Sequence, residues 1–115
     1  MPHVPLRLLT VVAEAVLADR LARAMLDAGA LGFTMTAAKG VGARNRSSVK
    51  ASAPNVRIEV LAGAATMKCL LDMLNEQWFP HYPMVAWESA VDLSYSEQFL
   101  GRSDDADDPA QKPRE

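Results

Sequence analysis

The hydrophobic positions along the chain mark four predicted strands. The stretch from Val4 to Ala13 is apolar at both alternating sets of positions, which is typical of a central strand covered on both faces. Leu31 to Ala37, Asn55 to Leu61 and Val85 to Leu93 alternate between apolar and polar residues, so each is predicted to bury one side. In the last of these strands we expect the buried side to consist of Val85, Trp87, Val91 and Leu93.

Two further stretches carry apolar residues at the three-to-four spacing of a helix. Glu14 to Ala28 is predicted to pack through Leu17, Leu21, Met25 and Ala28. Ala64 to Phe79 is predicted to pack through Met67, Leu70, Leu71, Leu74 and Trp78. Gly29 follows the first helix directly, where a left-handed C-terminal cap is common.

The elements follow the order strand, helix, strand, strand, helix, strand, which is the split-βαβ or ferredoxin-like order. The predicted fold class is therefore α+β, with an antiparallel sheet and both helices on one of its faces. The other face is expected to carry Thr34, Thr36, Arg57, Glu59, Glu88 and Asp92. Such a polar face either meets water or packs against another subunit.

The 115 residues suffice for one domain, and a composition of 50% hydrophobic and 23% charged residues is that of a globular protein. No apolar run approaches the ~20 residues of a membrane helix, and the start of the chain lacks the layout of a signal peptide. We expect a cytoplasmic protein with one domain at 1–101 and a disordered acidic tail at 102–115. The single cysteine, Cys69, excludes an internal disulfide and is interpreted as a buried structural thiol.

The connection between the second and third strands, Ala38 to Pro54, concentrates the candidate binding residues. A connection longer than ~12–15 residues in a compact domain is usually functional or disordered. It contains Lys39, Gly40, Gly42, Arg44, Asn45, Arg46, Ser47 and Ser48, and no acid occurs from residue 28 to residue 58. Glycines can turn backbone N–H groups toward an anion, and arginines donate paired hydrogen bonds to phosphate. The connection therefore suits a phosphate-bearing ligand, although a solvated loop fits the same pattern, and neither a Walker nor a Rossmann motif is present.

Three stretches resemble the P-II-like signalling proteins in content, order and spacing: Gly29 to Thr34, Lys39 to Ser48 and Asn55 to Leu61. The resemblance is closest to the bicarbonate-linked branch, the SbtB proteins and the carboxysome-associated P-II proteins, and runs from about Leu6 to Gly101. The long connection lacks the tyrosine that is uridylylated in nitrogen-regulatory members.

The resemblance implies a homotrimer that binds adenine nucleotides between its subunits and is not an enzyme. The long connection would be the T-loop, which changes shape with the bound ligand and docks on a target. The implied ligands are AMP, ADP, ATP or cyclic AMP, together with bicarbonate in some members. The implied target is a bicarbonate transporter, which would recruit the protein to the membrane, or a carboxysome-associated protein. By position, the implied nucleotide-binding residues are Thr34, Gly40, Gly42, Arg44, Asn45, Arg46, Ser47 and Met84.

One departure and two alternatives stay open. Met84 stands where the SbtB pattern has a glycine, so the preferred nucleotide is not fixed. An RNA-binding module is disfavoured because the predicted open face lacks an aromatic stacking platform. An enzyme would need an acid–base pair, and Glu59 and Glu88 facing each other across the open sheet are better interpreted as part of a subunit interface. His3 and His81 are too few for a metal site, so no metal, cofactor or catalytic residue is expected.

Overall fold

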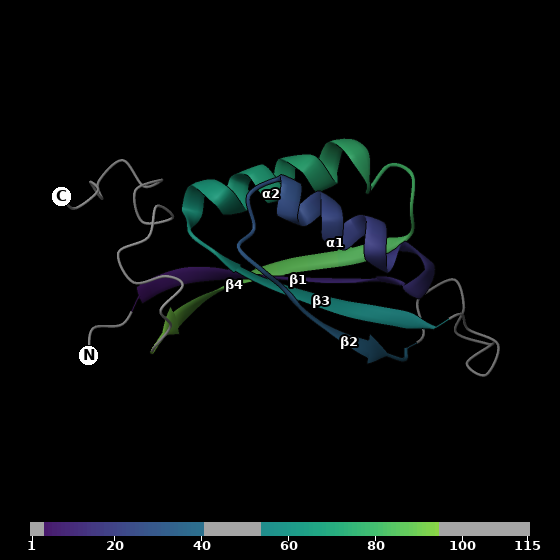
Figure 1. Cartoon of the computed structure of the whole chain (residues 1–115), viewed down its shortest axis with the longest axis horizontal. Coiled ribbons are helices and arrows are strands. Elements are labelled where there is room, and N and C mark those ends of the chain that lie inside the picture. The colour runs from purple at the N-terminus through teal and green to yellow at the C-terminus, as the bar shows by residue number, and fades with distance from the viewer. Residues whose placement is uncertain (1–3, 41–53, 95–115) are drawn as a thin grey trace.

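The computed structural model describes residues 4–40 and 54–94, and its elements follow the predicted order. The strands are β1 (Val4–Glu14), β2 (Thr34–Ala38), β3 (Asn55–Ala62) and β4 (Met84–Leu93). A 3-10 turn, η1 (Ala15–Leu17), leads into helix α1 (Ala18–Asp27), and helix α2 (Ala64–Gln77) follows β3. Both helices cover one face of a single sheet, as Figure 1 shows, which confirms the predicted ferredoxin-like α+β class.

The doubly apolar strand lies inside the sheet, as predicted. The strand order is β2-β3-β1-β4, and every neighbouring pair is antiparallel. Leu9 and Val11 of β1 belong to the core beneath the helices, and neither side chain has any exposed surface. Leu6 and Thr10, on the alternating positions, are also buried. Residues of both alternating sets are buried in β1, and this is why its sequence is apolar at both sets of positions instead of alternating.

The core between sheet and helices is built from the predicted helical stripes. Leu21 and Met25 of α1 and Leu70 and Leu74 of α2 are fully buried against Ile58 of β3. Burying each such side chain contributes roughly 1.5–3 kcal/mol to folding. The periodicity therefore located the packing faces of both helices correctly.

Helix α1 ends in a turn that requires glycine. Gly29 has a φ of 115°, a backbone conformation that residues with a side chain rarely adopt. Its N–H donates to the carbonyl of Leu26 at 3.0 Å, and the N–H of Ala30 donates to the carbonyl of Met25 at 3.0 Å. These two bonds form a Schellman motif, which confirms the predicted left-handed cap.

Strand β2 begins later than the alternation from Leu31 predicts. After the Schellman turn, residues 31–33 carry the chain from the helical layer to the sheet, and pairing starts where Thr34 meets Glu59. Phe33 is consequently 40% exposed instead of buried. The alternating pattern was real, but the preceding turn leaves its first residues outside the sheet.

In strand β4, the side that faces the core is the opposite of the predicted one. Met84 pairs with Ala13 and Ala86 with Val11, so these residues share the helix-covered face. Val85 and Trp87 therefore lie on the open face, 53% and 49% exposed. The prediction failed because both alternating sets of β4 contain apolar residues, and only the register with β1 decides which set faces the helices.

The acids of β4, Glu88 and Asp92, also lie on the opposite face from the open one on which they were predicted. Glu88 pairs with Leu9 and Asp92 with Pro5, positions that lie on the helix side of the sheet. Glu88 instead accepts a hydrogen bond from Nε of Arg7 at 2.9 Å. The suggested approach of Glu59 and Glu88 across the open sheet is thus wrong, because the two carboxylates lie on opposite faces.

Cys69 also differs from its prediction. It was interpreted as a buried structural thiol, but it is exposed on α2 beside the buried Leu70. Consecutive residues of a helix point about 100° apart, so one residue can be fully buried while its neighbour faces water.

Candidate functional site

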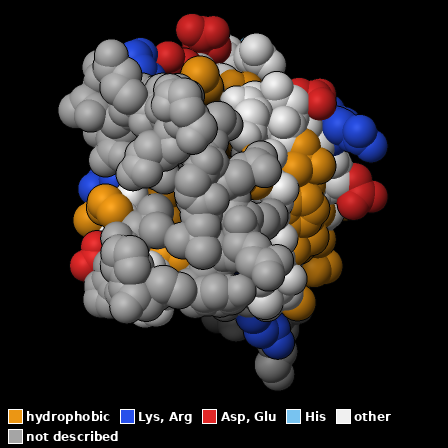
Figure 2. All heavy atoms as spheres, turned by 60° about the vertical axis from the view of Figure 1, so that its left-hand side comes forward, with side chains coloured by type: hydrophobic (Ala, Val, Ile, Leu, Met, Phe, Trp, Pro, Cys, Tyr) orange, Lys and Arg blue, Asp and Glu red, His pale blue; other side chains and the backbone are white. Residues whose placement is uncertain are grey.

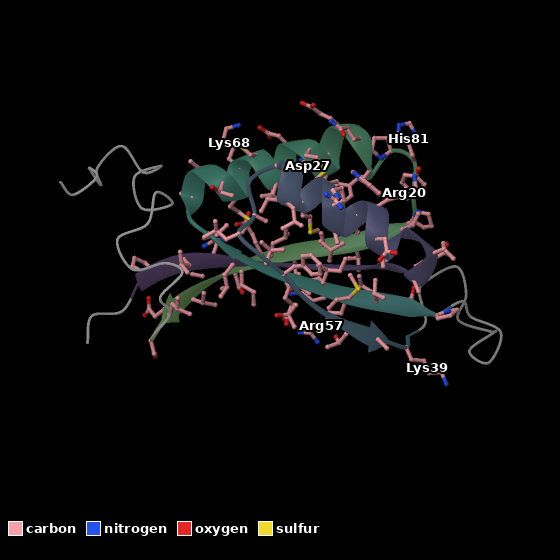
Figure 3. The ribbon with its side chains drawn as sticks, in the orientation of Figure 1. Arg20, Asp27, Lys39, Arg57, Lys68 and His81 are labelled. Carbon is pink, nitrogen blue, oxygen red and sulfur yellow. The ribbon has the colours of Figure 1, made fainter. Side chains whose placement is uncertain are left out.

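The two ends of the long connection lie at one end of the sheet. Ala38 pairs with Asn55, so the chain leaves β2 and returns into β3 at the same level. The carbonyl of Pro54 accepts a hydrogen bond at 2.8 Å from the N–H of Ala15, which fixes this return to the start of η1. Lys39 and Gly40, which follow β2, are both exposed, and Figure 3 shows the Lys39 side chain pointing away from the sheet.

Met84 reaches the same end of the sheet but on its far edge. Ala13 pairs with both Val56 and Met84, which places the start of β4 level with the start of β3. β2 and β4 are nevertheless the two outer strands, about 14 Å apart at ~4.8 Å per strand. Gly40 and Met84 therefore lie near opposite edges of one chain's sheet, with β3 and β1 between them.

Thr34 lies away from this end. It opens β2, opposite Glu59, and its exposed side chain shares the open face with Arg57 and Glu59. Ala38 lies four positions further along the strand, which is about 13 Å at ~3.3 Å per residue. A ligand extending along β2 could span this distance, with one end at Thr34 and the other near Gly40.

The remaining predicted binding residues, Gly42, Arg44, Asn45, Arg46 and Ser47, lie outside the described residues. Their assignment as ligand contacts stays a prediction. The structure shows where the chain enters and leaves the segment that contains them.

The connection from α2 to β4 packs against α1 through an arginine that sequence reasoning missed. The guanidinium of Arg20 lies 5.6 Å from the ring centre of Trp78 and 5.4 Å from that of Tyr82. It also donates a hydrogen bond to the Tyr82 hydroxyl at 3.3 Å. Arg20 falls outside the apolar stripe of α1, so no pattern in the sequence signals this contact. The structure thereby ties the chain just before Met84 to the first turn of α1.

Two rows of side chains cross the open face of the sheet. The strand register aligns Thr34, Glu59, Thr10 and Trp87 in one row and Thr36, Arg57, Val12 and Val85 in the next. Arg57 and Glu59 form an ion pair at 3.2 Å, and Figure 3 shows Arg57 on the side of the sheet away from the helices. The face thus pairs a polar half near β2 with an apolar half near β4.

The surface also carries exposed hydrophobic side chains. Figure 2 shows hydrophobic side chains gathered in a band beside acidic and basic ones. Val85 and Trp87 are among the large hydrophobic residues with the greatest exposure. The register places both of these side chains on the open face of the sheet, in neighbouring rows.

Within the described ranges, no group of three His, Cys, Asp or Glu residues is arranged to hold a metal ion. None of the helices that the structure describes is long and apolar enough to cross a membrane.

Comparison with known proteins agrees with the fold. The chain matches the family model of nitrogen regulatory protein P-II over residues 6–95. A PII-like signalling protein from Thermus thermophilus shares 38% identity, with a TM-score of 0.69 over 81% of this chain and 93% of that one. No curated protein matches the chain.

Two more distant structures share the fold. CPII from Thiomonas intermedia K12, a nitrogen regulatory PII-like protein bound to ADP, AMP and bicarbonate, has a TM-score of 0.70 at 16% identity, over 82% of this chain and 98% of that one. A DUF3240 family protein from Shewanella baltica OS155 has a TM-score of 0.62 at 20% identity, over 83% and 96%. Because the family match spans most of the chain and the Thermus relative covers four-fifths of it, this chain belongs to the P-II family of signalling proteins.

Proposed function

We propose that this protein senses adenine nucleotides and reports them through the long connection between β2 and β3, which acts as its T-loop. The observation that carries the proposal is the position of this basic segment: both of its ends are fixed at one end of the sheet in a P-II fold. Backbone N–H groups at Gly40 and Gly42 would cradle phosphate, while Arg44 and Arg46 would neutralise it. Thr34, Asn45, Ser47 and Met84 complete the proposed nucleotide site.

The site would be shared between subunits of a homotrimer. Gly40 follows β2 and Met84 opens β4, the two outer strands, so in the proposed site these residues come from neighbouring subunits whose sheet edges meet. The exposed Val85 and Trp87 on the open face supply apolar surface that such an assembly would bury. A trimer would thus account for the incomplete site and the uncovered sheet face together.

ADP and AMP are the leading ligands, with bicarbonate as a second signal. The support is the CPII structure of the same fold, which holds ADP, AMP and bicarbonate, and the resemblance of residues 39–48 to the bicarbonate-linked branch. In this proposal the protein acts in the cytoplasm on a partner in inorganic carbon uptake, such as a bicarbonate transporter at the membrane, or on a carboxysome-associated protein.

The proposed mechanism is a population shift, without chemical conversion of the ligand. A ligand that contacts the T-loop in one conformation favours that conformation by the difference in its affinity for the two. The partner then distinguishes the liganded from the free shape. The family of this chain implies a regulator, so we expect the nucleotide to leave unchanged.

Isothermal titration calorimetry with AMP, ADP, ATP and cyclic AMP, each with and without bicarbonate, tests the proposal. We expect ADP or AMP to bind, and Arg46→Ala to weaken binding at least about tenfold, because one charge-assisted bond contributes roughly 1.5–3 kcal/mol. Arg23→Ala, an exposed arginine on α1, is the matched control and should bind as the wild type does.

The outcomes separate the parts of the proposal. No binding of any adenine nucleotide would overturn the sensor function. Binding that bicarbonate leaves unchanged would keep the nucleotide sensor and remove the link to inorganic carbon. Equal affinity of Arg46→Ala and the wild type would remove Arg46 from the phosphate site.

A second function, an RNA-docking or protein-docking module without nucleotide binding, has one observation in its favour. Trp87 lies exposed on the open face, where ferredoxin-like RNA-binding domains present aromatic side chains for stacking. Those domains stack two or three bases, whereas the described part of this face offers a single aromatic ring. Titration with single-stranded RNA at increasing salt tests this alternative, and saturable, salt-sensitive binding would favour it.

A further inference from the structure

Arg20 forms a stack that joins the two halves of the helical layer. Its guanidinium lies over both the Trp78 and Tyr82 rings, at 5.6 Å and 5.4 Å from their centres, and the rings lie 5.0 Å from each other. Its Nη1 donates to the Tyr82 hydroxyl at 3.3 Å. Figure 3 shows Arg20 on α1 directed toward the end of α2, where His81 also lies. One cation thus contacts both the residue that caps α2, Trp78, and the connection that follows it.

The connection itself is a tight, hydrogen-bonded turn. The carbonyl of Trp78 accepts hydrogen bonds from the N–H groups of His81 and Tyr82, each at 3.0 Å, and Phe79 donates to Leu74 at 2.8 Å. His81 packs edge-on against Tyr82 with 6.3 Å between the ring centres. Trp78 is buried in the core and fixes one end of the turn. The other end is held by the contact of Arg20 with Tyr82.

The turn leads directly into the edge strand. Tyr82 is followed by Pro83 and then Met84, which opens β4 and pairs with Ala13. Met84 is therefore held by its pairing with Ala13 on one side and by the turn on the other.

Arg20 is engaged by rings instead of by an acid. Within residues 4–40 and 54–94 the ion pairs are Arg7 with Glu88, Arg57 with Glu59 and Lys68 with Asp72, and none involves Arg20. A planar guanidinium can stack on aromatic faces and donate a hydrogen bond in its plane at the same time, which a lysine ammonium cannot match. The stack therefore uses properties specific to arginine.

We infer that Arg20 is a positioning residue for the nucleotide site: it holds the Trp78–Pro83 turn so that Met84 and the start of β4 present a fixed edge to the ligand. This inference rests on the proposed function, because it assigns the β4 edge to the nucleotide cleft. Arg20 acts through Tyr82 and does not touch the nucleotide.

The test compares Arg20→Leu, Arg20→Lys and Tyr82→Phe with the wild type, using Arg23→Ala as the control. Calorimetry gives the affinity for AMP, ADP and ATP, hydrogen exchange follows the amides of residues 78–84, and urea unfolding at a fixed protein concentration gives global stability. Arg20→Leu keeps an apolar side chain on the rings but removes the cation and the donor. Tyr82→Phe keeps the ring and removes only the acceptor hydroxyl.

We expect Arg20→Leu to weaken binding of all three nucleotides by a similar factor, about threefold to tenfold, given the strength of cation–π contacts at exposed sites. Amide exchange at residues 78–84 should accelerate while exchange in β1 and β3 stays as in the wild type. Arg20→Lys should recover part of the loss, and Tyr82→Phe should show a smaller loss than Arg20→Leu.

Three results would overturn the inference. Wild-type affinity in Arg20→Leu would show that the stack does not serve the site. A loss that grows from AMP to ATP would show that Arg20 contacts phosphate directly. A loss that comes with faster exchange throughout the domain would make the role purely structural. A wild-type protein that binds no adenine nucleotide would instead overturn the proposed function on which the inference rests.

Discussion

Single residues in this protein derive their roles from backbone conformation and from what they contact. Gly29 is required by a φ of 115° at the end of α1, whereas no atom of the described residues lies within 4 Å of the place where a Cβ of Gly40 would be. Arg20 and Arg23 are both exposed on α1, yet Arg20 stacks on two rings of the α2–β4 connection. The residue type alone therefore distinguishes neither Gly29 from Gly40 nor Arg20 from Arg23.

Gly29→Ala should destabilise the fold. A Cβ at this position would lie 3.5 Å from Cγ2 of Thr66, an ordinary contact, so the cost arises from the positive φ. Holding a non-glycine residue there costs on the order of 1–3 kcal/mol of unfolding free energy. Urea unfolding at a fixed protein concentration measures the change.

Gly40→Ala is the matched control for this substitution. It adds the same methyl group where no atom of residues 4–40 or 54–94 lies within 4 Å, so we expect a change in unfolding free energy below about 1 kcal/mol. Equal stability of the two variants would contradict the strain assigned to Gly29.

At the scale of the element, α2 shows how one helix divides its faces. Met67, Leu70 and Leu74 are buried against the sheet. The outer face carries the ion pair of Lys68 with Asp72 at 3.0 Å, in which the aspartate raises the pKa of the lysine. Both of these side chains are largely exposed, so the pair is screened by water and adds little to stability.

Leu70→Ala and Cys69→Ala should differ sharply although the residues are adjacent. Leu70 is fully buried, and removing it leaves a cavity that typically costs about 2–5 kcal/mol of unfolding free energy. Cys69 is exposed, so its substitution should stay within about 0.5 kcal/mol of the wild type.

Chemical unfolding of both variants, at one protein concentration, gives this comparison. A loss in Cys69→Ala as large as that in Leu70→Ala would mean that the thiol is packed against something, as the sequence-based interpretation held.

At the scale of the whole molecule, the two faces of the sheet differ in whether helices cover them. One face is covered by both helices, whereas the other presents the polar side chains of β2 and β3 beside the exposed Val85 and Trp87 of β4. A half-polar, half-apolar sheet face is suited to a subunit interface that excludes water at its apolar side.

Trp87→Asp should therefore dissociate the proposed trimer. The assembly would lose the apolar contact of the tryptophan. It would also bury an unpaired carboxylate, which carries a desolvation penalty. Light scattering coupled to size exclusion should show the mass fall from three chains toward one.

Leu26→Asp provides the comparison on the other side of the molecule. Leu26 lies on α1 and is 40% exposed, close to the 49% of Trp87, so the two substitutions start from similar exposure. We expect its mass to equal that of the wild type. Dissociation by both variants, or by neither, would remove the open face from the interface.

The sequence by itself determined the order and type of the four strands and two α-helices, the packing faces of both helices and the cap at Gly29, but not the 3-10 turn Ala15–Leu17, which occupies the start of the helix predicted from Glu14. These features depend on periodicities of 3.6 and 2 and on a conformation that glycine alone adopts readily, all of which are local. The basic, glycine-containing segment between β2 and β3 and its likeness to the P-II family were also evident from the residues.

Tertiary structure alone decided which side of β4 faces the helices, the exposure of Cys69 and the partnership of Arg20 with Trp78 and Tyr82. Alternation defines two sets of side chains in a strand, but the core-facing set is fixed by register with β1, and both sets of β4 contain apolar residues. Arg20 and Tyr82 are 62 residues apart, and their contact exists only because α1 and α2 pack side by side on one face of the sheet. Contacts between distant segments follow from packing, and no local pattern records them.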